Sequence, residues 1–537
     1  MTLQLENSGK IPALPMLVVV IGAFMSFLDS SIVNVALPHM MAVFGASTDD
    51  IQWVLTAYLL TCGILIPTSA FLCERFGHRR IYILALLIFT LGSAFCGISW
   101  NLNIMIGARV IQAIGGGLII PVSMAIVYLL APPEKMGMAM GLWGLAAILG
   151  PSVGPTLGGW LVDSFSWEWI FFINVPIGFI TILLCPFILK ETPLNRNIKF
   201  DVLGTLLITI ACFSLLLALS KGTDWGWGSQ SIISLLIIFF FTLLAFAFWE
   251  RSVPNPLIDI RIFKNRAVVA SLLAMSLVTI GMLGAIFIIP LYAENLLGFS
   301  PLKTGILMMP MALVSAALMP ISGKIYDKFG AFHAGLVGII IAIMVTYAMR
   351  NIGLLSSYHH LQNILALRSI GFGLALMPIA NAAMSAVPAE FAATTSAVVN
   401  TMRQVASSLG IAVVNYAIVV RQAYHQNVLH NCINYSSLPA AEAINKVQAQ
   451  LTTRGIDSIS SKTQALSLIN QLCARQAAMN AIDDSIVLLA LLLVLAIPLV
   501  FLLTPRQVAS ARIWQEKHWK ASVLGAPSET ADKVFDL

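Results

Sequence analysis

The sequence predicts an all-helical integral membrane protein, and three observations support this fold class: the composition, the length of the apolar runs and the distribution of charge. Of 537 residues, 58% are hydrophobic and 10% are charged, whereas a soluble domain has about 45 to 50% and about 25%. The mean hydropathy is +0.89. So much apolar surface has to be buried in a bilayer, which excludes a water-soluble enzyme and a disordered chain.

About fourteen apolar stretches are long enough to cross a membrane, which takes about 20 helical residues. They are about twice as long as the strands of a membrane barrel and lack their alternating pattern, so we expect helices. The stretches begin near Leu14, Ile51, Ile81, Asn103, Met138, Trp169, Val202, Ser231, Ala267, Leu302, Phe332, Leu361, Val398 and Ser485.

The positive charges predict the orientation of these spans. Most of the 30 Lys and Arg residues lie in alternate connections, beginning with Lys10 and the group Arg75, Arg79 and Arg80. The short loops on the opposite side contain only Lys221, Lys303 and Arg350. Because cytoplasmic loops carry the excess of Lys and Arg, we expect both termini in the cytoplasm.

An internal repeat indicates two equivalent halves. Residues 74–77 (Glu-Arg-Phe-Gly) follow the second stretch, and residues 327–330 (Asp-Lys-Phe-Gly) follow the tenth. Arg109 in the fourth stretch likewise corresponds to Arg368 in the twelfth. Stretches one to six therefore match nine to fourteen, which leaves the seventh and eighth as an inserted pair.

This repeat predicts the domain organisation. We expect an N-terminal six-helix bundle at 1–189, a linker with two inserted transmembrane helices at 190–266 and a C-terminal six-helix bundle at 267–504. The second bundle includes a long outer segment at 421–484, and a cytoplasmic tail follows at 505–537. Two repeated bundles are typical of a transporter with a site near the bilayer midplane.

The fifth stretch contains a series of small residues. Such residues at four-residue spacing let another helix backbone approach closely, and a proline removes one helix hydrogen bond and permits a bend. General helix packing would explain one or two of these glycines. The series consists of Gly141, Gly150, Gly154, Pro155, Gly158 and Gly159.

Three segments resemble those of the major facilitator superfamily, and within it the fourteen-span drug:proton antiporters of the EmrB and QacA type. The glycine series is similar to their antiporter motif, and residues 28–38 and 290–310 are similar to two further motifs. The resemblance covers nearly the whole chain. It implies proton-coupled efflux of hydrophobic or amphipathic drugs by alternating access across the bacterial cytoplasmic (inner) membrane, with no cofactor or metal.

The two repeated loops resemble the gating loops of this family. The second loop has the expected glycine and aspartate, whereas the first has Ala70 and Glu74 in their places, so we expect less close packing there. The gating residues are Glu74, Arg75, Gly77 and Arg79 in the first loop and Gly323, Asp327, Lys328 and Gly330 in the second.

Asp29 is the main candidate for proton coupling, because it stands alone in an apolar run well inside the bilayer, where an isolated carboxylate is costly. Arg109 enters from the opposite side to within one or two helical turns of its depth. Burial favours the neutral acid and the arginine favours the ionised one, so Asp29 can exchange a proton if Arg109 moves. The alternative is a permanent ion pair. Glu294, near the outer end of the ninth stretch, is a second candidate or a solvated residue at headgroup level.

Several polar and aromatic residues are candidates for a substrate cavity that accepts hydrophobic or cationic small molecules, although packing or interfacial roles are the alternative. We expect Arg368 to be structural and Arg403 to extend towards the membrane surface. The cavity candidates are Asn34, Tyr58, Gln112, Trp143 and Tyr292.

The outer segment 421–484 is polar enough to leave the membrane, and residues 440–451 and 463–481 have helical spacing of their apolar positions. The resemblance implies a periplasmic adaptor and an outer-membrane channel as partners, with an unpartnered surface hairpin as the alternative. A disulfide between Cys432 and Cys473 is open if this segment faces an oxidising compartment.

Three other functions are alternatives to drug efflux. An exporter of an endogenous metabolite, siderophore or lipid would have the same fold. A membrane enzyme or a non-transporting sensor would need clustered catalytic residues, whereas the eight histidines are scattered in loops, near span ends and in the tail. No phosphate-binding GxxxxGK[ST] loop occurs, which argues against ATP as the energy source, and no basic run with interleaved aromatic residues indicates nucleic acid.

Overall fold

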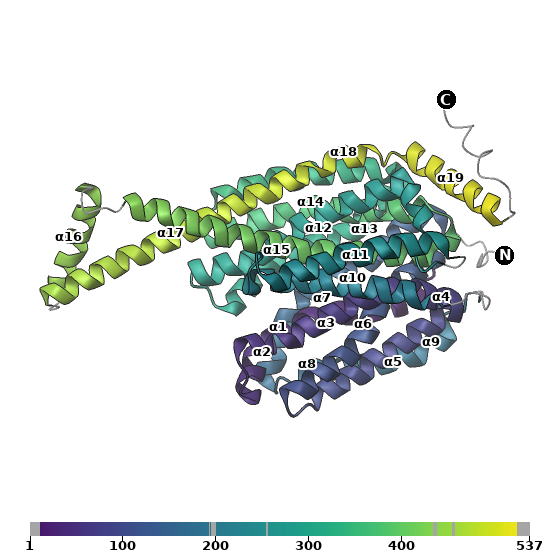
Figure 1. Ribbon diagram of the computed structural model, residues 1–537, viewed down its shortest axis with the longest axis horizontal. Helices are drawn as coiled ribbons and strands as arrows, with labels where there is room; N and C mark the ends of the chain where they lie inside the picture. Colours follow the sequence, from purple (N-terminus) through teal and green to yellow (C-terminus); the bar gives the residue numbers. More distant parts are fainter. Residues whose placement is uncertain are drawn as a thin grey trace.

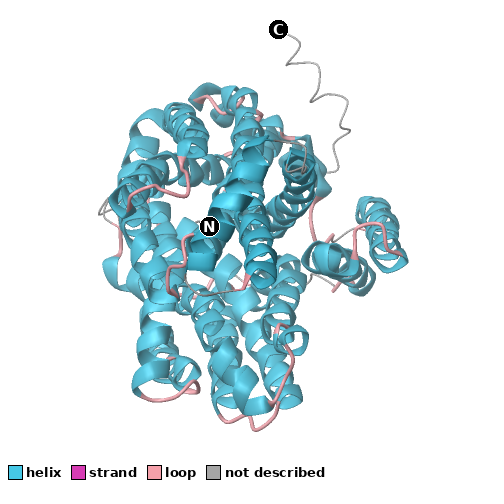
Figure 2. Cartoon of the chain, turned by 90° about the vertical axis from the view of Figure 1, so that its left-hand side faces the viewer, coloured by secondary structure: helices cyan, strands magenta, loops and turns pink. Residues whose placement is uncertain are grey.

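A computed structural model describes residues 11–192, 194, 200–253, 256–432, 438–453 and 457–523. These residues form helices and loops without a strand (Figures 1 and 2). Thirteen helices are long and apolar enough to cross a membrane. One of them, α13 (Pro301–Ala348), contains two spans, because Gly330 has a φ of 76° and breaks the helix near its middle. The predicted all-helical fold with about fourteen spans is therefore confirmed.

The first half contains six spans. Gly77, with a φ of 92°, separates the second span from the third, and the Asn101 side chain caps the fourth by accepting a hydrogen bond from the Ile104 N–H. The elements are α1 (Ala13–Phe44), α2 (Thr48–Ile51), α3 (Trp53–Leu65), α4 (Ser69–Phe76), α5 (His78–Gly97), α6 (Leu102–Leu130), α7 (Met136–Ser164), α8 (Trp169–Phe172) and α9 (Asn174–Ile188).

The inserted pair and the second half follow. Asp201 and Ser229 cap the two inserted helices through their side-chain oxygens. The inserted helices are α10 (Val202–Trp225) and α11 (Gln230–Ser252). The second half consists of α12 (Arg266–Pro290), η4 (Leu291–Leu296), α13, α14 (Tyr358–Ser385), α15 (Ala392–Cys432), α16 (Leu438–Thr453), α17 (Ser458–Val494), α18 (Ala496–Phe501) and, beyond it, α19 (Pro505–Val523).

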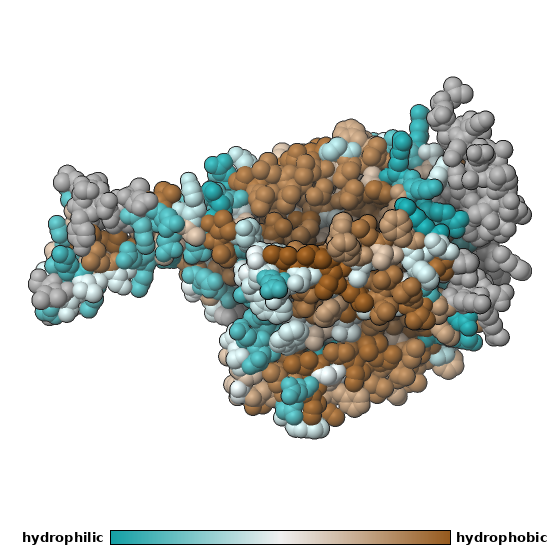
Figure 3. All heavy atoms as spheres, viewed as in Figure 1, coloured by the Kyte–Doolittle hydropathy of each residue, from teal (hydrophilic) through white to brown (hydrophobic). Residues whose placement is uncertain are grey.

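The two ends of the body differ in shape. α1 begins and α19 lies at one end of the body, the terminal end (Figure 1). At the other end, the hairpin end, α15 and α17 project beyond the body with α16 at the tip (Figure 1). The predicted helices 440–451 and 463–481 lie within α16 and α17. An apolar band covers the body between two more hydrophilic ends (Figure 3). The side chain of Cys432 is outside the described residues, so its disulfide with Cys473 stays a prediction.

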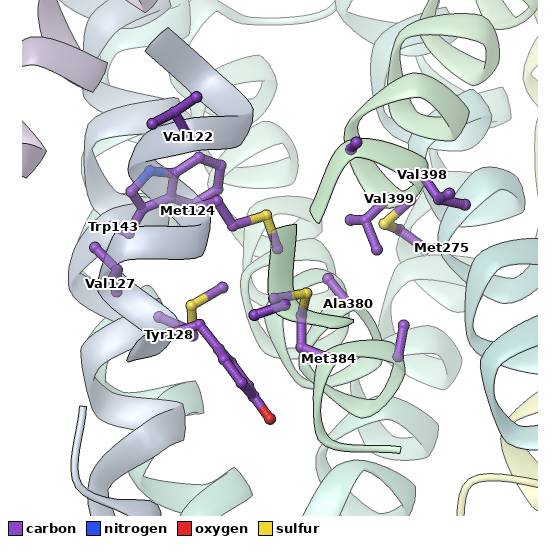
Figure 4. Packing of buried hydrophobic residues seen from close by; sticks show 14 of the residues in the cluster. Val122, Met124, Val127, Tyr128, Trp143, Met275, Ala380, Met384, Val398 and Val399 are labelled. Carbon is purple, nitrogen blue, oxygen red and sulfur yellow. The ribbon is translucent and has the colours of Figure 1, made fainter. Parts of the chain in front are cut away.

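The core is continuous between the halves at one end only. At the terminal end one hydrophobic cluster includes side chains of both halves, such as Met124 and Met384, which face each other in Figure 4. At the hairpin end two separate clusters occur, one around Ile32 in the first half and one around Ile288 in the second. A small further cluster of Leu60, Leu216 and Leu217 has Val405 of the second half packed against it. Apart from this contact, the halves share their core at the terminal end and have separate cores at the hairpin end.

Candidate functional site

Asp29 lies in a closed hydrogen-bonded cluster inside the first half. Its Oδ2 accepts a hydrogen bond of 2.7 Å from Arg109 Nη1, which also forms the ion pair. Its Oδ1 accepts from Gln112 Nε2 at 2.7 Å and from Asn174 Nδ2 at 3.1 Å. Arg109 Nη1 also donates to Gln112 Oε1 at 2.7 Å. All four side chains are fully buried, so this conformation holds an acid and a base together away from water.

The surroundings of Arg109 hold its guanidinium in place. Its Nε donates to the Val54 carbonyl at 3.2 Å, and its Cζ lies 4.0 Å from the centre of the Tyr58 ring and 5.7 Å from that of Phe171. These are cation–π distances. Its Nη2, however, is buried without a hydrogen-bond partner among the described residues. The Nη2 group of Arg109 is therefore a hydrogen-bond donor without an acceptor in this conformation.

Asn174 connects Asp29 to a second layer. Its Nδ2 also donates to Ser93 Oγ at 3.1 Å, and Ser93 Oγ donates to the Phe171 carbonyl at 2.8 Å. Asn174 Oδ1 is buried without a partner. We did not expect Asn174 or Ser93 from the sequence. The signal that identified Asp29, a polar side chain alone in an apolar span, would also have identified Asn174.

Close helix packing sets the position of the cluster. A Cβ at Gly92 would collide with the backbone of Gln112, and one at Gly115 would collide with the backbone at Phe89, so α5 and α6 touch beside the site. Such close approach is what small residues permit between membrane helices.

The glycine series of α7 has two different neighbours. Gly150, Gly154 and Gly158 pack against α1 between Phe27 and Val35, and they hold the α1 segment that carries Asp29. Gly141 instead meets the second half, where a Cβ would lie 2.5 Å from the Met319 carbonyl oxygen. Gly159 has Val35 only at 4.0 Å, and Pro155 is exposed.

The second gating loop ties the two halves together at the terminal end. The carboxylate of Asp327 accepts hydrogen bonds from the backbone N–H groups of Gly137 at 2.5 Å and Met138 at 2.9 Å, at the start of α7. Gly323 and Gly137 are in backbone contact across the same junction. A carboxylate at a helix N-terminus is favoured by the helix dipole. Lys328 lies over the Phe329 ring beside it.

The acid of the first gating loop makes a weaker contact across the halves. Glu74 Oε1 accepts one hydrogen bond, of 3.4 Å, from Thr394 Oγ1 of α15. The following residues dock on the start of the linker, where Glu191 accepts hydrogen bonds from the backbone N–H groups of Arg79 and Arg80. Arg75 stacks near Phe76.

The candidate cavity residues do not converge on one cavity in this conformation. Tyr58 and Gln112 belong to the Asp29 cluster. Trp143 is fully buried and donates from Nε1 to Ser123 Oγ at 2.9 Å. Tyr292 donates to the Gly353 carbonyl at 2.9 Å near the hairpin end, and Asn34 is exposed.

Two arginines lie deep within the spans of the second half, Arg368 and Arg403, and neither has an acidic partner within 4.0 Å among the described residues. Arg368 donates to the Gly281 carbonyl at 2.7 Å and to Thr346 Oγ1 at 3.2 Å. Arg403 donates to Asn400 Oδ1 at 2.8 Å. Glu294, the second acid candidate, is partly exposed in η4 and lies in neither arginine site.

Comparisons with known proteins agree with this architecture. The family model described as Major Facilitator Superfamily matches residues 19–411. The Bacillus subtilis protein named "Uncharacterized MFS-type transporter YhcA" is 33% identical over 98% of this chain and 99% of its own. The Multidrug export protein EmrB of Haemophilus influenzae is 32% identical over 77% of this chain and 82% of its own.

A solved structure has a similar fold. That of the human organic anion transporter MFSD10 aligns with a TM-score of 0.59 and 14% identity, covering 91% of this chain and all of that one. At this identity the likeness concerns the fold alone.

Proposed function

The chain belongs to the Major Facilitator Superfamily and is a transporter rather than an enzyme, and from that premise we propose that it exports hydrophobic or amphipathic small molecules in exchange for protons. The observation that carries the proposal is the sealed Asp29 cluster in the first half. The similarity to proteins named for multidrug resistance or export supports the choice of cargo.

The coupling works through the charge of Asp29. While the acid is ionised, it accepts three hydrogen bonds, one of which is the ion pair with Arg109, and these bonds hold α1, α6 and α9 together. A proton on Asp29 removes the charge that attracts Arg109, and in a low-dielectric site that attraction is much of what holds the cluster. The unpartnered Nη2 of Arg109 and Oδ1 of Asn174 leave hydrogen-bonding capacity for a second arrangement.

Alternating access requires the terminal end to open. In this conformation the halves separate at the hairpin end, so opening to the opposite side has to break the bonds of Asp327 to α7 and the shared cluster around Met124 and Met384. Because the glycines of α7 pack closely against α1, Asp29 would move together with α7 when the terminal end opens. The protein thereby couples the charge of one acid to the position of a whole half.

The energy of a proton is sufficient for this task. One charge that crosses 100 mV releases about 2.3 kcal/mol, which sustains about a 50-fold gradient of cargo because about 1.4 kcal/mol corresponds to a factor of ten. The positive charges of the terminal-end loops support a cytoplasmic location of that end in the bacterial inner membrane. The projecting α15–α17 hairpin would then be periplasmic, where an adaptor and an outer-membrane channel are its proposed partners.

Replacement of Asp29 tests the proposal. Asp29→Asn in sealed proteoliposomes should abolish uptake of rhodamine 6G driven by a pH gradient, because the amide takes up no proton. The matched control is Asp49→Asn, an exposed acid in α2, which should transport normally. Unchanged uptake by folded Asp29→Asn would reject proton coupling at this site and leave the permanent ion pair as its role.

A further inference from the structure

We propose that Arg403, with the rings of Phe27 and Trp143, forms a subsite between the two halves that binds the acidic group of an aromatic cargo, so that amphipathic organic acids are the preferred substrates. This inference rests on the proposed export function and specifies its cargo. It replaces the cationic cargo that the sequence suggested with an acid-bearing one.

Arg403 lies deep in the membrane body. It is eleven residues after the start of α15 at Ala392, which is about 16 Å along the helix and about half of a bilayer core. At that depth the side chain does not reach the membrane surface. Arg403 therefore does not extend to the interface as the sequence led us to expect. A cation held there without an acid is costly and indicates a functional site.

The neighbours of Arg403 come from both halves. Its Cζ lies 5.4 Å from the centres of both the Phe27 ring of α1 and the Trp143 ring of α7. These two rings meet edge to face with centres 5.9 Å apart. Figure 4 shows Trp143 and Val399, one turn before Arg403, on opposite sides of the junction. The guanidinium is thus placed where a cargo passing between the halves would touch it.

The three deep arginines differ in what occupies their donors. Arg109 is paired with Asp29, and Arg368 is 1% exposed and donates to backbone carbonyls and to Thr346. Arg403 donates a single hydrogen bond, to Asn400, and its side chain is partly exposed. Of these three, Arg403 alone combines a guanidinium that donates a single hydrogen bond with contact to the other half.

The chemistry of the pair of rings and the guanidinium selects the ligand. A guanidinium presents five N–H donors in a planar fork that fits a carboxylate with two parallel hydrogen bonds. The partly exposed Phe27 ring beside it can accept a flat apolar body by stacking, while the fully buried Trp143 packs edge to face against that ring. A cationic cargo would meet the positive charge of Arg403 with no acid of the described residues beside it.

The same helix connects this subsite with the proton site. Phe27 and Asp29 are two positions apart on α1, so they face different sides of the helix: Phe27 contacts Arg403 and Asp29 contacts Arg109. Cargo and proton therefore bind at separate places on one turn of α1. Movement of that turn would couple cargo binding at Arg403 to proton binding at Asp29.

Binding of two matched dyes tests the subsite without any proton gradient. Rhodamine 6G is an ethyl ester, and its hydrolysed form, rhodamine 19, differs by one free carboxylate. We expect purified wild-type protein to bind the acid more tightly than the ester. Arg403→Gln should weaken binding of the acid by about tenfold, which corresponds to the loss of one charge-assisted pair. It should change the affinity for the ester by no more than about twofold. The affinity of Arg403→Lys for the acid should lie between those of the wild type and Arg403→Gln.

The opposing results are equally definite. Three results would overturn the inference: the wild type binds the ester as tightly as the acid or more tightly, the wild type binds neither dye, or Arg403→Gln loses affinity equally for both dyes. An equal loss would indicate a packing role, because packing does not distinguish the dyes. If Arg403→Gln does not fold, Trp143→Phe is the second variant. It should weaken the binding of both dyes without changing the ratio of their affinities. A changed ratio would contradict selection of the acid by the guanidinium alone.

The failure of this inference and the failure of the proposed function are distinguishable. Asp29→Asn should keep the preference for the acid in this binding measurement while losing exchange in proteoliposomes. Exchange without a preference for the acid would reject the subsite alone. A preference without exchange would reject proton coupling alone.

Discussion

The two halves place an arginine at corresponding positions, but only the first half supplies an acid for it. Arg109 pairs with Asp29 at 2.7 Å, whereas Arg368 is held by the Gly281 and Met282 carbonyls and Thr346 and by the Phe372 ring at 4.4 Å. A buried ion pair responds to a proton, and a cation bonded to carbonyls does not. The repeat thus gives the two bundles a similar shape, while only the first has a deep acid beside its arginine among the described residues, which is where we propose that the proton is exchanged.

The gating loops show the opposite asymmetry. Asp327 of the second half accepts two backbone hydrogen bonds from the first, whereas Glu74 reaches a single hydroxyl at 3.4 Å. The halves therefore contribute different contacts: the first contains the proposed proton site, and the second supplies the acid that bonds across the terminal end.

Replacement of the two corresponding arginines should give the largest difference. Arg109→Met leaves the Asp29 carboxylate buried without its partner, and breaking a buried pair in this way costs about 3 to 5 kcal/mol. Arg368→Met breaks hydrogen bonds only, at about 1 to 3 kcal/mol, and should retain exchange. Thermal unfolding of the purified variants measures the difference, and equal losses would mean that the two arginines have the same role.

The two gating acids can be compared by the distance between the halves. Asp327→Ala removes two charge-assisted bonds of about 1.5 to 3 kcal/mol each, so it should enlarge the population open at the terminal end at least about tenfold. Glu74→Ala should change it only slightly. Spin labels at the exposed positions Arg80 and His333, in a background without reactive cysteines, report this distance. A larger effect of Glu74→Ala would reverse the assignment.

The glycine series offers a smaller test of the α1–α7 contact. Gly154→Ala places a methyl group against Ser31 Oγ and 3.1 Å from the Ile32 nitrogen, and overpacking of this kind costs about 1 to 3 kcal/mol. Gly159→Ala has only Val35 at 4.0 Å and should be nearly neutral. Unfolding temperature and exchange rate should both fall for the first variant only; equal behaviour would show that α1 and α7 tolerate separation.

The smallest effect is expected at Glu294. Glu294→Gln should leave proton exchange within about twofold, because this partly exposed acid lies in η4 with no deep arginine beside it. A loss of exchange comparable to that of Asp29→Asn would show that the second half also contributes an acid.

The sequence was sufficient for the fold and for the depth of the main acid. Run length, charge bias and the repeat predicted the spans, and depth along the helices suggested that Asp29 and Arg109 meet, as they do in the structure. Depth does not reveal which side of a helix faces which neighbour. For that reason Trp143 and Tyr58 were grouped as cavity residues although their contacts lie in different places, and the contact of Arg403 with α1 and α7 was missed. That contact depends on how α15 lies against the other half, which the sequence does not specify.

The most direct test of the central claim is the number of protons released when cargo binds. Purified protein in weakly buffered solution, followed with a pH indicator, should release protons on addition of either rhodamine 6G or rhodamine 19, after correction for the dye itself. Asp29→Asn should bind dye and release none, while Asp49→Asn should match the wild type. Equal proton release by Asp29→Asn and the wild type would contradict the claim that this carboxyl group carries the exchanged proton.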